Sequence, residues 1–162
     1  MSVPARQKLL AISSGGGHWI QLFRMRPAWD NLDVTYACTM YGLEDEIAQD
    51  AADRGGLKVR YVLLPEANRW QKARLIGLLL RIFWLILRFN PDTIITTGAA
   101  HGYFALRIGK WFGAKTIWID SIANAGEVSK SGMMVKPYAD VWLTQWEHLV
   151  GAEGPIFQGA VL

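Results

Sequence analysis

The sequence predicts an α/β fold in which a doubly wound parallel sheet is covered by helices on both faces. Short apolar segments alternate with amphipathic ones along the 162 residues, which is the pattern of strands connected by helices. Two apolar segments lead directly into turns of small residues, at positions 13–18 and 97–102. Neither a repeat nor a linker interrupts this alternation, so we expect one domain over residues 1–162.

The first half of the chain is expected to hold three strands and two helices. Three glycines at 15–17 end the first strand, and Gly55 with Gly56 ends the second helix. Pro27 should kink or shorten the first helix, because proline has no amide hydrogen to donate. The expected strands cover residues 8–13, 32–39 and 57–64, and the expected helices cover residues 18–30 and 43–54.

The second half is expected to continue the alternation with three more strands. Residues 121–137 are irregular and are interpreted as a loop with room for one short helical turn. The segment 151–162 shows no clear element of its own. The expected strands cover residues 93–97, 115–120 and 141–144, and the expected helices cover residues 72–89 and the stretch that ends at Phe112.

The composition bears on the partners of the protein. Hydrophobic residues make up 51% of the chain and charged residues 19%, and eight tryptophans exceed what a small core needs, so part of the apolar surface is expected to meet a membrane or a protein. The net charge of +3 suits anionic lipid, a diphosphate or nucleic acid without choosing between them. With one cysteine, Cys38, and three scattered histidines, we expect no disulfide, no metal site and no cofactor.

The helix expected at residues 72–89 carries an unusual pattern of charge. Arg74, Arg81 and Arg88 recur every seven residues and therefore share one stripe. Nearly all other residues from position 75 onwards are apolar, so the apolar arc is much wider than the roughly 100° that packing on a sheet requires. The excess predicts a second apolar partner for this helix.

Two interpretations of that partner remain open. The apolar part spans only about 22 Å, too short to cross a bilayer, but it can lie in the membrane interface with Trp70 and Trp84 at headgroup level and the arginines reaching lipid phosphates. Alternatively, the helix is fully buried and its arginines lie at its solvent-exposed edge. We favour the interface, so a membrane surface is an expected partner.

The glycine-containing turns predict an anion site rather than a familiar nucleotide motif. No Gly-Lys-Ser/Thr follows the first turn, and Ile20 stands where the dinucleotide fingerprint needs a third glycine. Amides at the carboxyl ends of neighbouring strands suit phosphate, although such turns can also be simple tight connections. The expected anion-binding residues are Ser14, Gly15, Gly16 and Gly17 in the first turn and Gly98, Ala99, Ala100 and His101 in the second.

Two residues beside these turns are candidates for acid–base chemistry. His18 begins a helix, where the dipole disfavours its cationic form and leaves a neutral imidazole as a base; the alternative is that it only hydrogen-bonds its own loop. Asp120 ends the fifth strand and borders the same crevice, where it can accept a proton or cap the next turn.

The motifs, taken in order, resemble the acceptor-side subunit of split glycosyltransferases. This family includes the bacterial exopolysaccharide and capsule glucuronosyl- and galactosyltransferase subunits and the membrane-anchoring subunit of the eukaryotic dolichol-pathway N-acetylglucosamine transferase. The resemblance covers nearly the whole chain. It rests on Ser-Ser-Gly-Gly-Gly-His at 13–18, Pro-Ala-Trp at 27–29, Pro-Asp at 91–92, Thr-Gly-Ala-Ala at 97–100, Gly-Lys-Trp-Phe-Gly-Ala-Lys-Thr-Ile at 109–117 and Gln-Trp-Glu at 145–147.

The resemblance implies a Rossmann-like domain equivalent to the N-terminal half of a GT-B glycosyltransferase. Its two glycine-rich turns would hold the diphosphate of a polyprenyl-linked sugar acceptor, and a separate partner subunit would bring a UDP-sugar, by analogy UDP-glucuronic acid. An inverting transfer needs a base, for which His18 is the first candidate and Asp120 the second. Several relatives carry glutamate at position 120, which makes the role of Asp120 less secure. Nucleic acid is not an expected partner.

The same resemblance suggests where the protein works. The eukaryotic subunit has an N-terminal transmembrane anchor that is lacking here, so attachment would fall to residues 72–89 and the protein would be peripheral on the cytoplasmic face of the inner membrane. A partner-docking role is expected for the apolar residues of the final segment, Ile156, Phe157, Val161 and Leu162. The alternatives are a non-catalytic scaffold that recruits and activates a complete transferase, and a self-contained small-molecule enzyme.

Overall fold

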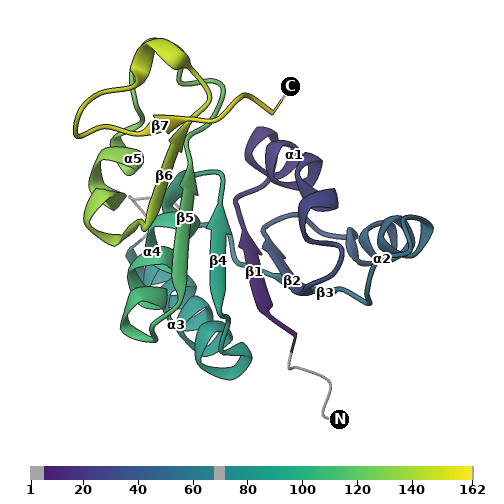
Figure 1. Ribbon diagram of the computed structural model, residues 1–162. Helices are drawn as coiled ribbons and strands as arrows, with labels where there is room; N and C mark the ends of the chain where they lie inside the picture. Colours follow the sequence, from purple (N-terminus) through teal and green to yellow (C-terminus); the bar gives the residue numbers. More distant parts are fainter. Residues whose placement is uncertain (1–5, 68–71, 162) are drawn as a thin grey trace.

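A computed structural model describes residues 6–67 and 72–161, which form one parallel seven-stranded sheet (Figure 1). The strand order is β3-β2-β1-β4-β5-β6-β7. The strands are β1 (Lys8–Ile12), β2 (Asp33–Cys38), β3 (Arg60–Leu63), β4 (Thr93–Thr96), β5 (Lys115–Ile119), β6 (Val141–Thr144) and β7 (Ile156–Phe157). The helices are α1 (Gly17–Arg24), α2 (Glu44–Asp53), α3 (Lys72–Phe89), α4 (Ala99–Trp111) and α5 (Lys130–Val135), with 3-10 turns at η1 (Arg26–Trp29), η2 (Lys136–Tyr138) and η3 (Glu147–Leu149).

Both faces of the sheet are buried, as parallel strands require. In β1, Leu9 and Ala11 join a core under α1 and α2, while Leu10 and Ile12 join a core under α3 and α4. Figure 1 shows α1 and α2 on one side of the strands and α3, α4 and α5 on the other. The predicted doubly wound α/β fold is therefore confirmed.

Pro27 shortens the first helix, as expected. The regular helix α1 ends at Arg24, and the chain continues as the 3-10 turn η1 with the proline at its start. Trp29 closes this turn by donating its indole hydrogen to the Tyr36 hydroxyl of β2 at 2.8 Å. The turn is thereby fixed to the sheet.

The expectation that residues 151–162 form no element of their own was wrong. Ile156 and Phe157 form β7, which pairs in parallel with Leu143 and Thr144 of β6. Two residues give no periodic signal in a sequence, and only the open edge of β6 makes them a strand. The region 121–137 contains the short helix α5, whose first turn is capped by the Ser129 side chain accepting from the Gly132 amide at 2.9 Å.

Helix α3 is half buried, so the fully buried interpretation was wrong. Its sheet-facing residues Leu78, Ile82 and Ile86 have no exposed surface. An apolar stripe on the opposite face stays exposed and consists of Ile76, Leu80, Trp84 and Leu87. No helix in the described ranges is long and apolar enough to cross a membrane.

Candidate functional site

The candidate site lies where the strand order reverses. The first chain half builds the sheet outwards from β1 through β2 to β3, and the second half builds it in the other direction from β4. Because β1 and β4 are neighbours and parallel, with Ile12 beside Thr96, the turns after them emerge side by side. This is the topological switch point at which open α/β sheets bind ligands.

A reciprocal pair of hydrogen bonds joins the two turns. The His18 Nδ1 atom lies 2.8 Å from the Thr97 carbonyl oxygen, and the Thr97 hydroxyl donates to the His18 carbonyl oxygen at 2.7 Å. Gly98 permits this contact: a Cβ atom there would lie 2.8 Å from His18 Cε1, and its φ of +124° is unfavourable for other residues. The two predicted anion-binding turns therefore form one unit.

The contact also determines the tautomer of His18. A carbonyl oxygen only accepts, so Nδ1 must carry the hydrogen when the ring is neutral. Nε2 then keeps its lone pair and has no hydrogen-bond partner among the described residues. His18 therefore bonds the neighbouring turn rather than its own loop, and its role as a base stays a prediction.

The first turns of α1 and α4 supply free amides at this unit. The amides of Gly17 and His18 in one helix, and of Ala99 and Ala100 in the other, meet no acceptor within residues 6–67 and 72–161. The Gly15 amide is already used, because it donates to the Thr39 hydroxyl at 3.0 Å. Two helix N-termini side by side favour an anion through both their amides and their dipoles.

His18 and Asp120 line one cavity of about 200 Å³. The cavity lies between the second turn, represented by Gly98 and Ala99, and the loop that follows β5. Asn124 and the residues around Ser129 provide further polar groups on its wall. The two predicted acid–base candidates are therefore brought together by the fold.

Asp120 nevertheless acts in this structure as the anchor of the loop after β5. Its buried carboxylate accepts from the Asn124 side-chain amide at 3.0 Å, from the Ser129 amide at 2.7 Å and from the Ser121 amide at 3.2 Å. These are the contacts of a capping residue, which was one of the two interpretations of the sequence. A role as proton acceptor stays a prediction.

His101 lies on the other side of the first turn, in a second cavity of about 390 Å³. Its Nε2 lies 3.3 Å from the Pro65 carbonyl oxygen and donates to it, and Nδ1 has no partner among the described residues. Burial lowers the pKa of His101, which is only 4% exposed, so the ring is neutral at pH 7. Ser14, Gly15, Gly16 and His101 therefore line this second cavity and not the one that contains His18.

Sequence reasoning missed two buried glutamines that hold the site together. The Gln21 side chain donates to the Gly17 carbonyl oxygen at 3.1 Å and accepts from the Ile122 amide at 3.0 Å. The Gln145 amide nitrogen donates to Gln21 Oε1 at 2.7 Å and to the Asp120 carbonyl oxygen at 2.9 Å. The position of Gln21 four residues after Gly17 was a faint signal, whereas Gln145 carried none apart from the resemblance.

Four of the five predicted lipid-contacting residues lie on α3, and none of the four lines these cavities. Arg74, Arg81 and Arg88 are exposed, and the Trp84 side chain is 62% exposed. Trp70 lies outside the described residues. In the final segment Ile156 is 48% exposed and Phe157 and Val161 are half buried, while Leu162 is not described.

No group of histidine, cysteine and acidic side chains in the described ranges has the arrangement of a metal site. The described groups around the switch-point cavity are the amide donors of the two turns, the His18 imidazole and the Asp120 carboxylate. These groups suit the binding of a phosphorylated ligand and the transfer of a proton.

Solved structures show the class of this fold. The chain superimposes on MurG from Acinetobacter baumannii with a TM-score of 0.69, at 9% identity over 96% of this chain and 46% of that one. UDP-N-acetylglucosamine 2-epimerase from Rickettsia bellii follows with a TM-score of 0.65, at 19% identity over 96% of this chain and 45% of that one. The chain thus has the expected fold of the N-terminal half of a GT-B glycosyltransferase and spans about half of these structures.

Sequence comparison adds two curated relatives, although no family model matches. The chain is 25% identical over 170 residues to the UDP-N-acetylglucosamine transferase subunit Alg14 of Schizosaccharomyces pombe, covering 90% of this chain and 79% of the relative. It is 25% identical over 114 residues to ALG14 of Candida albicans, covering 63% of this chain and 52% of the relative. Both are named as subunits of a sugar transferase.

Proposed function

We propose that this chain is the acceptor-binding subunit of an inverting glycosyltransferase at a membrane surface. The observation that carries the proposal is the reciprocal bonding of His18 and Thr97, which combines two sets of free amides and one free imidazole nitrogen in a single crevice. The diphosphate of a polyprenyl-linked sugar would lie over the amides of the two turns. The similarity to two transferase subunits supports this assignment.

In the proposed reaction His18 acts as the base. Its Nε2 accepts the proton of an acceptor hydroxyl while that oxygen attacks the anomeric carbon of a UDP-sugar. The new bond joins the acceptor oxygen to that carbon, and the bond from the carbon to the UDP oxygen breaks with inversion. UDP leaves, and the proton passes from the imidazole to solvent.

The donor would be brought by a partner subunit with a nucleotide-sugar-binding domain. Exposed Ile156 and the half-buried Phe157 and Val161 are proposed to dock that partner, and the exposed face of α3 is proposed to lie on the membrane. Two donors are to be compared, UDP-glucuronic acid from the resemblance and UDP-N-acetylglucosamine from the names of the relatives. The proposed place is the cytoplasmic face of the inner membrane, in assembly of an exopolysaccharide or capsule repeat unit.

The first test is to purify the tagged full-length chain from detergent-extracted native membranes and identify what accompanies it. The complex is then assayed with each UDP-sugar and a polyprenyl-diphosphate-sugar acceptor. A companion with a nucleotide-sugar-binding domain, and transfer that needs both chains, is the expected result. A lone chain absent from the membrane fraction would contradict the proposal.

A second candidate function is a non-catalytic scaffold for a complete transferase. The three donors that occupy the Asp120 carboxylate favour it, because they use one of the two candidate bases to hold a loop. If the partner alone glycosylated a soluble acceptor analogue at the rate of the complex, the scaffold would replace the proposed role.

A further inference from the structure

A basic groove separates α3 from the edge strand β3, on a part of the surface distinct from the switch point. Its volume is about 470 Å³. Its walls combine apolar and aromatic side chains with guanidinium groups. The lining residues are Thr35, Arg60, Val62, Arg81, Trp84, Leu85, Arg88 and Phe89.

The charges of the groove are unbalanced. Within residues 6–67 and 72–161, neither Arg81 nor Arg88 has an ion-pair partner, whereas Arg60 pairs with Asp33. The groove therefore has three guanidinium groups and one paired carboxylate, that of Asp33, so two positive charges are left uncompensated. An anion that enters the groove gains charge-assisted hydrogen bonds from planar donors that match phosphate.

The aromatic ring of Phe89 lines the groove and is contacted by two cationic side chains. The Arg60 guanidinium lies 5.1 Å from the ring centroid of Phe89, and the Lys8 ammonium lies 5.8 Å from it. Lys8 also donates to the Phe89 carbonyl oxygen at 3.2 Å, which offsets the partial negative charge at the carboxyl end of α3. The groove thus combines apolar contact surface with cationic side chains.

The groove lies at the flank of the exposed apolar stripe. At about 100° per residue, Arg81 and Arg88 fall within about 20° of each other around α3. They lie between the buried face, represented by Ile82, and the exposed stripe, represented by Leu80 and Trp84. A membrane that covers the stripe would therefore bring its headgroups to the mouth of the groove.

We propose that this groove binds the headgroup phosphate of one anionic membrane phospholipid. Arg81 and Arg88, with Arg60 opposite, hold the phosphate, and the acyl chains run along Trp84 and Leu85 toward the exposed stripe. The proposal rests on the proposed membrane position of α3 and adds a discrete, saturable site to it. Charge complementarity distinguishes this occupant from a neutral lipid.

The test titrates the full-length chain with dihexanoyl phosphatidylglycerol below its micelle concentration, followed by NMR of the methyl groups of Val62 and Leu85. We expect saturable binding of one molecule. Arg81→Gln/Arg88→Gln should weaken it about 20–30-fold, since each basic residue near an anionic lipid contributes roughly fivefold.

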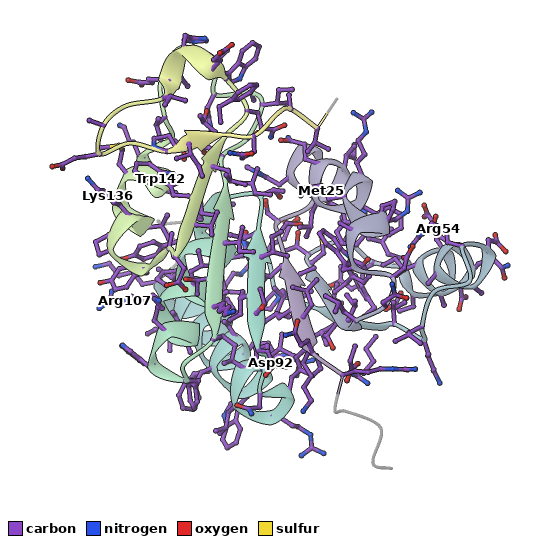
Figure 2. The ribbon with its side chains drawn as sticks, viewed as in Figure 1. Met25, Arg54, Asp92, Arg107, Lys136 and Trp142 are labelled. Carbon is purple, nitrogen blue, oxygen red and sulfur yellow. The ribbon has the colours of Figure 1, made fainter. Side chains whose placement is uncertain are left out.

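A matched variant controls for the loss of two positive charges. Arg24→Gln/Lys136→Gln removes the same charge from α1 and η2; Figure 2 shows Lys136 at the outer edge of the molecule beside α5. This variant should bind the lipid within about twofold of the original chain. If both double variants bound the lipid equally weakly, the groove would not be the binding site.

Two other ligands identify what the groove selects. If dihexanoyl phosphatidylcholine bound as tightly as dihexanoyl phosphatidylglycerol, the proposed selection for an anionic lipid would be wrong. If inorganic phosphate bound as tightly, the ligand of the groove would be a free anion and not a lipid. Flotation with phosphatidylcholine vesicles containing phosphatidylglycerol tests the membrane position separately. If the protein did not float with the vesicles but still bound the short-chain lipid, the proposed membrane position would be contradicted. The binding site in the groove would remain supported.

Discussion

At the scale of single residues, His18 and Thr97 connect sequence to chemistry. They are 79 positions apart, yet two hydrogen bonds of 2.8 and 2.7 Å hold their turns together. The same contact determines which imidazole nitrogen carries hydrogen. An imidazole with a defined tautomer and a fixed ring is better suited to the proposed proton transfer than a mobile one.

Replacement of His18, the proposed base, gives a direct prediction. His18→Ala should reduce transfer by the native complex about 10²–10⁴-fold, because a positioned general base contributes about that much. Pull-down of the partner should be unchanged, since the His18 side chain bonds Thr97 and none of the described residues of the proposed docking segment. Near-normal turnover would remove His18 from the mechanism.

His101 gives a prediction about pH. Its pKa is lowered chiefly by burial, so the unfolded chain takes up a proton below about pH 6.5 while the folded chain does not. The free energy of unfolding should therefore fall as the pH drops from 6.5 toward the lower folded pKa, by at most about 1.4 kcal/mol per pH unit.

Urea unfolding at pH 7.5 and 5.5 measures this dependence. His101→Gln keeps an amide donor for the Pro65 carbonyl oxygen but cannot titrate, so its stability should change less between the two pH values. An identical loss in both proteins would assign the effect to other groups.

At the scale of elements, α4 approaches β4 closely because two of its residues are glycines. A Cβ atom at Gly102 would lie 2.1 Å from the Thr96 hydroxyl oxygen, and one at Gly109 would lie 2.3 Å from the Ile94 Cδ1 atom. Both partners are fully buried on the sheet. These glycines let α4 pack directly on β4.

The packing predicts opposite effects for two glycine-to-alanine changes. Gly102→Ala should destabilise the protein by about 2–3 kcal/mol, because buried Thr96 cannot move aside. Gly77→Ala in α3 meets nothing within 4 Å and should stabilise it by about 0.5–1 kcal/mol through lower entropy of the unfolded chain. Chemical denaturation of both variants checks the pair.

Helix α3 offers a second matched pair, one residue from each face. Leu80→Ser on the exposed stripe should change stability by less than about 1 kcal/mol but weaken vesicle binding about tenfold. Ile82→Ser on the buried face should cost about 3–5 kcal/mol. Undiminished flotation of the Leu80 variant would contradict the membrane role of the stripe.

At the scale of the whole molecule, two glutamines join distant parts of the chain around the site. The Gln145 amide nitrogen bonds Gln21 of α1 and the Asp120 carbonyl oxygen, and its oxygen accepts from the Val161 amide at 2.8 Å. The candidate site and the proposed docking segment are therefore parts of one hydrogen-bonded network.

Removal of the Gln145 side chain should destabilise all the segments that it joins. Gln145→Ala removes the hydrogen-bond partner of the Asp120 carbonyl oxygen and of the Val161 amide, and one of the two donors to Gln21 Oε1. It should cost about 2–3 kcal/mol, with faster hydrogen exchange at the amides of Ile122 and Val161. Gln49→Ala on the exposed face of α2 is the control and should change neither quantity. Faster exchange at Val161 alone would show that the network does not transmit the change.

The candidate site was predictable to the extent that it depends on local chemistry. The glycines that follow apolar segments predicted both turns. His18 was singled out because it stands at the start of an expected helix. The sequence did not separate His101 from His18, because the side of a turn on which a side chain lies depends on tertiary packing. The loop-capping role of Asp120 depends on Asn124 and Ser129 folding back toward it.

The sequence by itself determined the strand–helix alternation, the two turns at the switch point and the apolar helix with its arginine stripe, because each of these depends on residues close together in the chain. Only the tertiary structure decided that β7 joins the sheet, that His18 bonds Thr97, that α3 leaves one apolar face exposed and that a groove opens beside β3. Those features depend on contacts between segments far apart in sequence, which local periodicity does not record.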